Sequence, residues 1–235
     1  MKSKIFSAVV IFGIMLTNCD PFGIKGEGEI VGEQISMPEI TKINMAIDAN
    51  VNITESDIQE IRIEAQQNII NNITTGVNEG SWNIQFDKNV RKHDGITIYI
   101  STALINEVVL TGSGNINSLD TFENSNFKLI ITGSGNIDFK AACTSSEINI
   151  SGSGNLTLIG TATSQNIEIP GSGSFNGFNF ESDSCEINIP GSGNCEVFSN
   201  NYLNVGITGS GNVYYRGLPQ ISSNITGSGE IINAN

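Results

Sequence analysis

Acidic side chains offer the first candidate chemistry in this sequence, because paired carboxylates can hydrolyse glycosidic bonds. Glu147 and Glu186 precede similar motifs, and Glu168 lies close to the same position. We expect them to form a solvated acidic face. The cationic help that a lyase needs is also scarce, because the segment after residue 112 holds only Lys128, Lys140 and Arg216 as cations. We therefore assign no catalytic residue, and a carbohydrate-active enzyme (a polysaccharide lyase or hydrolase) remains the alternative to a non-catalytic protein.

Other sites for chemistry lack their partner residues. His93 is the single histidine, and its polar neighbours Lys92 and Asp94 indicate an exposed loop. No CxxC or HxxxH spacing occurs, so no metal site and no cofactor is predicted. A phosphate-binding glycine turn needs a following helix, and a calcium β-roll needs Asp in a nine-residue repeat. Neither pattern accompanies the glycines of this chain.

Aromatic side chains gather late in the chain and could stack on a ligand such as a sugar ring. The candidates are Phe178, Phe198, Tyr202 and Tyr214. The competing interpretation, which we favour, is that most of them fill the core or a corner of the fold.

A repeated Gly-Ser-Gly motif decides the architecture. Its first glycines, spaced by 18 to 21 residues, are Gly112, Gly133, Gly152, Gly171, Gly191, Gly209 and Gly227. The positions two and four before this glycine and four after it are occupied almost entirely by apolar residues, whereas Thr, Ser or Pro directly precedes it. Each repeat therefore predicts an alternating strand, a tight turn and a second alternating strand, with the apolar columns facing a core.

A repeat this short cannot bury its own apolar face, so it must stack on its neighbours. The sequence predicts an all-β fold, a parallel, right-handed β-helix or β-solenoid. A sandwich of antiparallel hairpins is disfavoured, because hairpins would alternate the direction of the columns. The glycines are expected to supply backbone angles that other residues avoid.

The same pattern continues upstream without the glycine motif. It recurs around Gly26–Gly28, Ile47–Asn50 and Ala65–Asn68, and two further strands are predicted at Trp82–Phe86 and Ile96–Ile100. We therefore expect degenerate coils over residues 26–106 and regular coils over residues 107–235.

An amide column follows each glycine motif, three residues after its first glycine. Its members are Asn115, Asn136, Asn155, Asn194 and Asn212, with Ser174 and Glu230 as exceptions and with Asn50 and Asn68 in the same place upstream. Stacked amides can hydrogen-bond along the axis, so we predict a structural Asn ladder.

The N-terminus has the features of an export signal. Lys2 and Lys4 precede an apolar run, Ile5–Leu16, that is too short to span a bilayer stably. It ends in Leu-Thr-Asn-Cys, which resembles a bacterial lipobox, although Asn18 replaces the usual small residue. We expect a signal peptide at residues 1–18, acylation of Cys19, and an anchor linker at residues 19–25.

Charge and cysteine content narrow the set of partners. The formal net charge of −13 argues against nucleic acid, and membrane contact is expected through the lipid anchor alone. After Cys19, the chain contains Cys143, Cys185 and Cys195, an odd number that leaves open whether Cys143 and Cys185 pair. Cys195 lies in an apolar column and is expected to be buried and unpaired.

The last repeat lacks any segment that would cover it. Ser223 and Asn233 interrupt its apolar columns, and Glu230 replaces the ladder amide. A terminal coil exposes unpaired backbone groups, which can pair with another chain. We therefore expect either self-association through the C-terminal coil or an end blunted by these polar residues.

These motifs resemble the auto-transporter adhesin family with the head GIN domain, exported proteins common in Bacteroidetes. The resemblance spans residues 35–232 and rests on the repeated Gly-Ser-Gly-Asn-Ile motif, on Ile47–Ile53 and on Ile61–Ala65. It implies a β-helix fold and an exported location, but supplies no site residues. We expect a non-catalytic lipoprotein, anchored in the outer membrane and facing the periplasm or the surface. It would be an adhesive or structural module, with an unidentified glycan or protein as its ligand.

Overall fold

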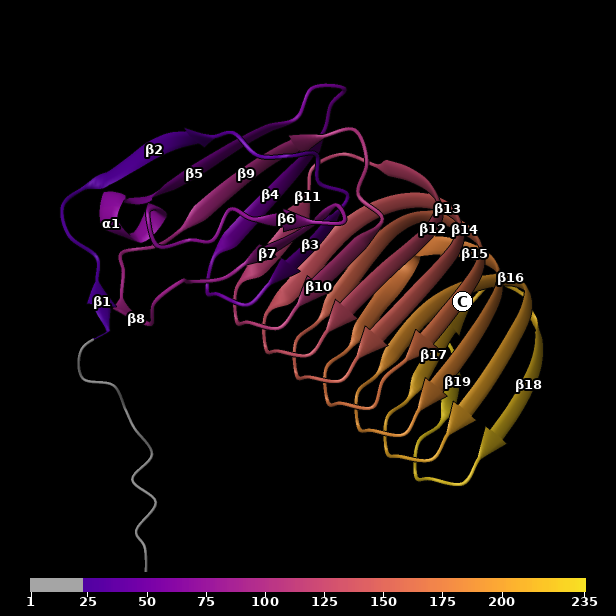
Figure 1. Cartoon of the computed structure of the whole chain (residues 1–235). Helices are drawn as coiled ribbons and strands as arrows, with labels where there is room; N and C mark the ends of the chain where they lie inside the picture. Colours follow the sequence, from indigo (N-terminus) through magenta and orange to yellow (C-terminus); the bar gives the residue numbers. More distant parts are fainter. Residues whose placement is uncertain (1–22) are drawn as a thin grey trace, which may run out of the picture.

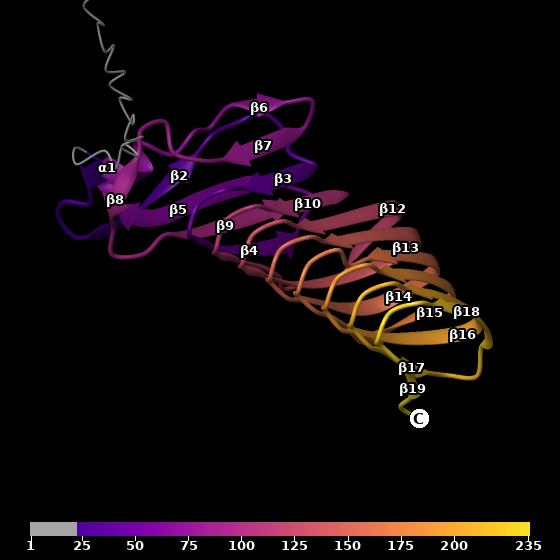
Figure 2. The ribbon, with the colours of Figure 1, turned by 90° about the horizontal axis from the view of Figure 1, so that it is seen from below.

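The computed structural model describes residues 23–235, and the expected signal peptide and Cys19 lie outside this part of the chain. The strands run as one long stack from the N-terminal strands to the C-terminal coil (Figures 1 and 2). No helix of the described part is long and apolar enough to span a bilayer. The elements before residue 103 are β1 (Ile24–Lys25), β2 (Ile30–Ile35), β3 (Lys42–Met45), β4 (Asn50–Glu55), β5 (Glu60–Gln66), α1 (Gln67–Ile70), β6 (Val77–Asn78), β7 (Ser81–Ile84), β8 (Val90–Lys92) and β9 (Thr97–Thr102).

The rest of the chain forms the regular coils. Their strands are β10 (Glu107–Leu110), β11 (Asn115–Ser118), β12 (Phe122–Ile131), β13 (Asn136–Ile150), β14 (Leu156–Glu168), β15 (Phe175–Ile189), β16 (Cys195–Ile207), β17 (Val213–Arg216), β18 (Gln220–Ile225) and β19 (Ile231–Asn233). Each coil pairs in parallel with the next at the register that the glycine motif predicts. The predicted parallel β-solenoid is thus confirmed, whereas its right-handed sense stays a prediction.

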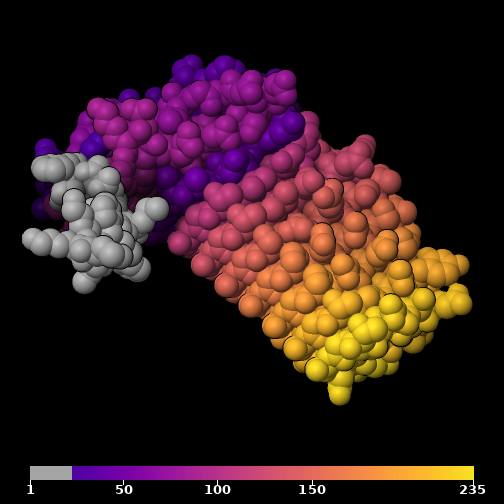
Figure 3. All heavy atoms as spheres, turned by 60° about the horizontal axis from the view of Figure 1, so that its bottom comes forward, coloured from indigo at the N-terminus to yellow at the C-terminus, as the bar shows by residue number. Residues whose placement is uncertain are grey.

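The apolar columns form a continuous core. Alternating residues of each strand point inward, and the side chains of Ile137, Leu156, Phe175, Cys195 and Val213, one from each of five successive coils, are fully buried. Burial of such a column stabilises the stack because each coil removes apolar surface of its neighbours from water. In the space-filling view, the coils appear as successive bands across the molecule (Figure 3).

The glycines of the turn are required by the close approach of neighbouring backbones. None of the Gly-Ser-Gly residues has a positive φ, so the expected reason for their presence is wrong. A Cβ on Gly173 would overlap the carbonyl oxygen of Gly154 in the preceding coil, and the same holds for Gly154 against Gly135. Turns stacked this closely leave no room for a side chain.

Before residue 103, the order of the coils in the stack differs from their order in the sequence. β3 lies between β7 and β10, and β4 lies between β9 and β11, all in parallel. The coil made by β3 and β4 is therefore inserted between a later coil and the regular stack. The strands predicted at Trp82–Phe86 and Ile96–Ile100 correspond to β7 and β9.

Two of the degenerate copies do not form coils in series. β5, which contains Ile61 and Ile63, pairs antiparallel with β9 and β2, and Asn68 lies in α1 rather than in the amide ladder. The strand before Gly26, β1, pairs with β8 in a separate two-stranded sheet. The expectation for these segments was wrong because a period of two predicts which side chains are buried but not the direction of the strand.

Candidate functional site

One outer flank of the solenoid carries polar side chains that stack from coil to coil. They come from the strand before each glycine turn, where every second residue points outward. One column, five residues before each motif, is Glu107, Lys128, Glu147, Asn166, Glu186, Asn204 and Ser222. A second column, seven residues before it, is Asn126, Ser145, Ser164, Ser184, Tyr202 and Gln220. We call the surface between these two columns the flank groove.

The first hollow of the flank groove lies where the regular coils begin, and it has a volume of about 520 Å³. It forms because β10 begins at Glu107, so the stretch Phe122–Asn126 at the start of β12 pairs on one side, with β13. The side-chain amide of Asn124 donates to the carbonyl of Ile105 at 2.7 Å and so partly closes the gap. Phe127 forms an apolar part of the wall and is itself almost fully buried.

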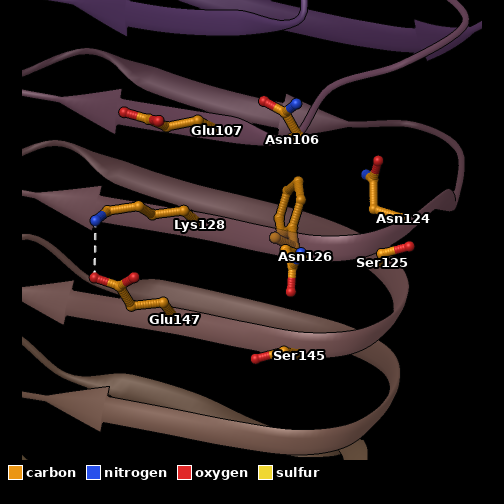
Figure 4. A pocket seen from close by; sticks show the side chains of 9 residues that line it. Asn106, Glu107, Asn124, Ser125, Asn126, Lys128, Ser145 and Glu147 are labelled. Carbon is orange, nitrogen blue, oxygen red and sulfur yellow. Dashed lines mark ion pairs between the residues drawn. The ribbon is translucent and has the colours of Figure 1, made fainter.

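Charges in this hollow alternate along the axis. Figure 4 shows Glu107, Lys128 and Glu147 on three successive strands, with asparagine and serine side chains towards the starts of these strands. The Lys128 ammonium pairs with the Glu147 carboxylate at 2.8 Å, and this hydrogen bond raises the pKa of Lys128. The ion pair holds the Lys128 side chain over the neighbouring strand. The uncharged groups that the hollow offers a ligand are the amides and hydroxyls of its asparagine and serine side chains.

Two further hollows continue the groove towards the C-terminus. The second, of about 370 Å³, shares Ser145 with the first and is lined by Ser164, Asn166 and Glu186. The third, of about 270 Å³, shares Tyr202 with the second. The shared residues place the three hollows next to one another along the flank.

The four candidate aromatic residues lie in two places. Tyr202, on the strand before a glycine turn, is 61% exposed and contributes to the flank groove. Phe178, Phe198 and Tyr214 follow the glycine turns and are half-buried. The Arg216 guanidinium lies 4.2 Å from the centre of the Phe178 ring, so this ring already has a cation on its face. Among the four, Tyr202 therefore offers the most open ring.

The amide ladder forms in two pieces. The side-chain amides of Asn115, Asn136 and Asn155 donate to Asn50, Asn115 and Asn136, respectively, at 3.0–3.1 Å. Ser174 has no amide, but its backbone N–H donates to the Asn155 amide oxygen at 3.3 Å. Beyond this serine, the backbone N–H groups of Asn212 and Glu230 donate to the amide oxygens of Asn194 and Asn212 at 2.9 Å. The arrangement is structural and lies at the turns, away from the flank groove.

The three described cysteines are free thiols, so Cys143 and Cys185 do not pair in this structure. Burial raises the pKa of the half-buried Cys143 to about 11. It also raises the pKa values of Cys185 and Cys195, which are buried in the core. Raised pKa values suppress the reactive thiolate. Within residues 23–235, no cluster of His, Cys, Asp or Glu is placed to hold a metal ion.

Sequence reasoning identified Glu147 and Glu186 as members of one column but missed the groove. The sequence contained the signal, because the position five before each glycine motif is polar in every repeat and the position seven before it is polar in every repeat but the first, which has Ile105. Alignment shows a column, whereas only the folded chain shows that β10 starts late and opens the first hollow.

Comparisons with known proteins agree with this architecture. A family model described as "Putative auto-transporter adhesin, head GIN domain" matches residues 39–219. No curated protein matches the sequence significantly. Three crystal structures of Bacteroidales proteins show the same fold, at identities that support the fold alone.

A "putative adhesin" from Bacteroides fragilis has a TM-score of 0.85 and 24% identity, over 90% of this chain and 100% of that chain. Another from Parabacteroides merdae has a TM-score of 0.76 and 18% identity, over 91% of this chain and 99% of that one. A "putative lipid binding protein" from Parabacteroides distasonis has a TM-score of 0.73 and 23% identity, over 90% and 99% of the two chains.

Proposed function

Because the chain belongs to the auto-transporter adhesin family with the head GIN domain, we propose that it is a non-catalytic binding module of the cell surface. The observation that carries the proposal is the flank groove, in which three neighbouring hollows present hydroxyl, amide and carboxylate groups on a stack of paired strands. A rigid scaffold favours binding, because little conformational entropy is lost when the ligand docks. Its family is associated with adhesion, and its partner would be a glycan or a protein.

Export and anchoring form the second part of the proposal. The apolar segment Ile5–Leu16 and the Leu-Thr-Asn-Cys sequence support a lipoprotein whose residue 19 carries the acyl chains. We expect the wild type to sediment with the outer membrane and Cys19→Ala to lose this association. Mass spectrometry of the membrane-extracted protein would detect the acylated N-terminus. An unmodified Cys19 in a soluble secreted form would contradict the anchor.

A cell-adhesion assay tests the binding function. Cells that display the full-length protein should adhere to a surface of host or bacterial glycans and proteins more strongly than cells that display no copy. Display must be equal in both samples, as measured with an antibody to a tag. Equal adhesion of the two samples on all surfaces would contradict the proposed binding function.

The second candidate is a carbohydrate-active enzyme, favoured by two carboxylates that line one hollow, as glycoside hydrolysis requires a pair. Glu107 and Glu147 both line the first hollow and belong to coils two steps apart, or about 10 Å between backbones. The Glu147 side chain is 55% exposed and is paired with Lys128, which suits a solvated ion pair better than a general acid in an apolar pocket. Release of reducing ends from polysaccharides by the wild type, and its loss in Glu147→Gln, would establish catalysis instead.

Self-association through the C-terminal coil is a separate proposal about partners. All residues of β18 are exposed, including Ile221 at 39% and Ile225 at 41%, and β18 pairs with β16. An exposed strand edge favours pairing with another strand. Light scattering after size exclusion should find dimers of the wild type and monomers of a variant with Ile225→Pro and Ile231→Lys. A wild type that is monomeric at high concentration would exclude this association.

A further inference from the structure

The length and direction of the flank groove restrict the shape of its ligand. The column from Glu107 to Ser222 crosses seven successive coils, which at about 4.8 Å per coil spans about 29 Å. The three hollows follow this direction, along the axis and across the strands. A ligand that fills all three must therefore be long and narrow.

Backbone pairing leaves little of the groove open to a peptide that would bind as an added strand. Along the groove, β13 to β15 each pair in parallel with the strand before and the strand after, and the start of β12 has a free side only over the short stretch Phe122–Asn126. A peptide that adds a strand needs a free edge, and the groove crosses the strands instead of following an edge. Recognition must therefore use side chains, and these are mainly amides and hydroxyls, which both donate and accept hydrogen bonds.

Charge restricts the ligand further. The groove contains the carboxylates of Glu107, Glu147 and Glu186 but a single cation, Lys128, which is already paired. The protein has a formal net charge of −13, so anionic polymers would be repelled. A neutral polymer rich in hydroxyl groups is complementary to this surface.

Tyr202 supplies a platform in the same groove. It borders both the second and the third hollow, and its ring is largely exposed. Ser184 and Gln220 occupy the matching positions of the coils on either side. A tyrosine ring offers an apolar face for the C–H groups of a sugar and a hydroxyl for its polar edge.

We infer that the flank groove binds a neutral linear glycan laid along the solenoid axis, with Tyr202 stacking on one of its sugar rings. This inference rests on the proposed binding function and names the ligand class and the surface. The repeated polar positions contact successive sugars, so affinity grows with the length of the glycan until the groove is filled.

The test uses the full-length protein in liposomes and neutral oligosaccharides of increasing length as probes, namely oligomers of glucose, mannose and N-acetylglucosamine. Alginate and heparin serve as anionic polymers of similar length. We expect affinity for one neutral series to rise with length, and the anionic polymers to bind more weakly. Tyr202→Ala should weaken the binding of the longest oligomer about tenfold, whereas Tyr202→Phe should retain most of it.

Two matched variants separate the groove from the rest of the surface. Ser164→Tyr places a bulky side chain in the second hollow, whereas Thr157→Tyr alters the same strand, β14, outside the groove. Thr157 is half-buried, as Ser164 is. We expect Ser164→Tyr to reduce binding and Thr157→Tyr to leave it unchanged.

The outcomes distinguish this inference from the proposed function. If displayed protein mediates adhesion but Tyr202→Ala and Ser164→Tyr adhere like the wild type, the groove is not the binding surface and the inference fails alone. Adhesion lost in both groove variants, with tighter binding of anionic polymers or peptides than of neutral glycans, would also overturn it. If the wild type mediates no adhesion, the proposed function fails first.

Discussion

The turns of the regular coils contain glycine, whereas the turn of the inserted coil does not. Gly112 and Gly114 belong to the coil that stacks on Ala46–Ala49, and a Cβ on either would overlap the backbone of that turn. The inserted coil itself has no glycine there, and Ile47 and Ala49 are buried instead. Glycine is thus required only where another turn lies directly beneath.

The neighbour of the inserted coil explains why it tolerates side chains at its turn. Ala46 and Asn50 donate backbone hydrogen bonds to Ile84 and Ile96, the two points where β7 ends and β9 approaches. The intervening residues 85–95 leave the stack and form β8, which pairs with β1 in another sheet. No tight turn therefore lies under Ile47, and space remains for its side chain.

The two ends of the stack differ in how far other strands cover them. At the N-terminal end, β5 continues the sheet antiparallel to β9, β2 pairs antiparallel with β5, and β6 pairs antiparallel with β7. At the other end, the strand β18 is exposed at every position. The antiparallel strands cover one end of the core, whereas the last coil leaves its apolar side chains partly in water.

The largest effect should come from a charge in the inserted coil. Met45 and Ile225 occupy the same column, but Met45 is fully buried and Ile225 is 41% exposed. Met45→Asp should lower the free energy of unfolding by about 4 kcal/mol or more, and Ile225→Asp by about 1 kcal/mol. Urea unfolding, followed by circular dichroism and by the fluorescence of Trp82, measures both.

Met45→Leu is the control and should cost less than about 1.5 kcal/mol. Because the inserted coil contacts both regions, the two probes should report one transition in the wild type. Separate transitions would show that the two regions unfold independently, and equal costs for the two aspartates would contradict the effect of burial.

Glycine substitution should give the next largest effect. A Cβ on Gly173 would overlap the Gly154 carbonyl and approach Ile150 Cγ2 at 2.8 Å, whereas a Cβ on Gly76 would meet no atom within 4 Å. Gly173→Ala should therefore cost about 3 kcal/mol, and Gly76→Ala should change stability by no more than about 0.5 kcal/mol. Thermal unfolding of both variants decides the matter, and a well-tolerated Gly173→Ala would refute the steric explanation.

The amide ladder should contribute less. Asn155→Ala removes the side-chain bond to Asn136 and the acceptor of the Ser174 N–H, at a cost of about 1–3 kcal/mol. Glu230→Ala should cost within about 0.5 kcal/mol, because Glu230 donates through its backbone to Asn212. Equal and small costs in denaturant titrations would mean that the column is merely solvated.

The smallest effect concerns the three thiols of residues 23–235, which lie in the regular coils. The pKa of Cys143 is raised to about 11 from an ordinary value of 9.0. The folded state therefore binds a proton more tightly, and its contribution to stability is complete below pH 9 and decreases towards pH 11. We expect the unfolding free energy to fall over this range, and less so in Cys143→Ala.

Reaction with a thiol reagent gives a second measurement of the same difference. At pH 8, Cys143 should react about a hundredfold more slowly than an exposed thiol, because little thiolate is present. The fully buried Cys195 should react more slowly still, and Cys195→Val should be nearly neutral, since the thiol occupies an apolar column. Rapid labelling of Cys195 in the native protein would contradict its burial.

The sequence alone determined the regular half of the molecule and the family. Seven glycine motifs at nearly constant spacing predict a solenoid of stacked coils, because each short repeat must bury its apolar face on a neighbour. The burial of Cys195 and the hydrogen bonds between the ladder amides from Asn115 to Asn155 lie at the places that this repeat indicates.

Tertiary structure decided the remainder. The alternation of Ile61 and Ile63 is the same in a parallel and in an antiparallel strand, so only pairing with β9 shows the direction of β5. Insertion of β3 and β4 between later strands depends on contacts between residues far apart in the sequence, which no local pattern records. The flank groove arises likewise, because its first hollow exists only where β10 begins late beside β12.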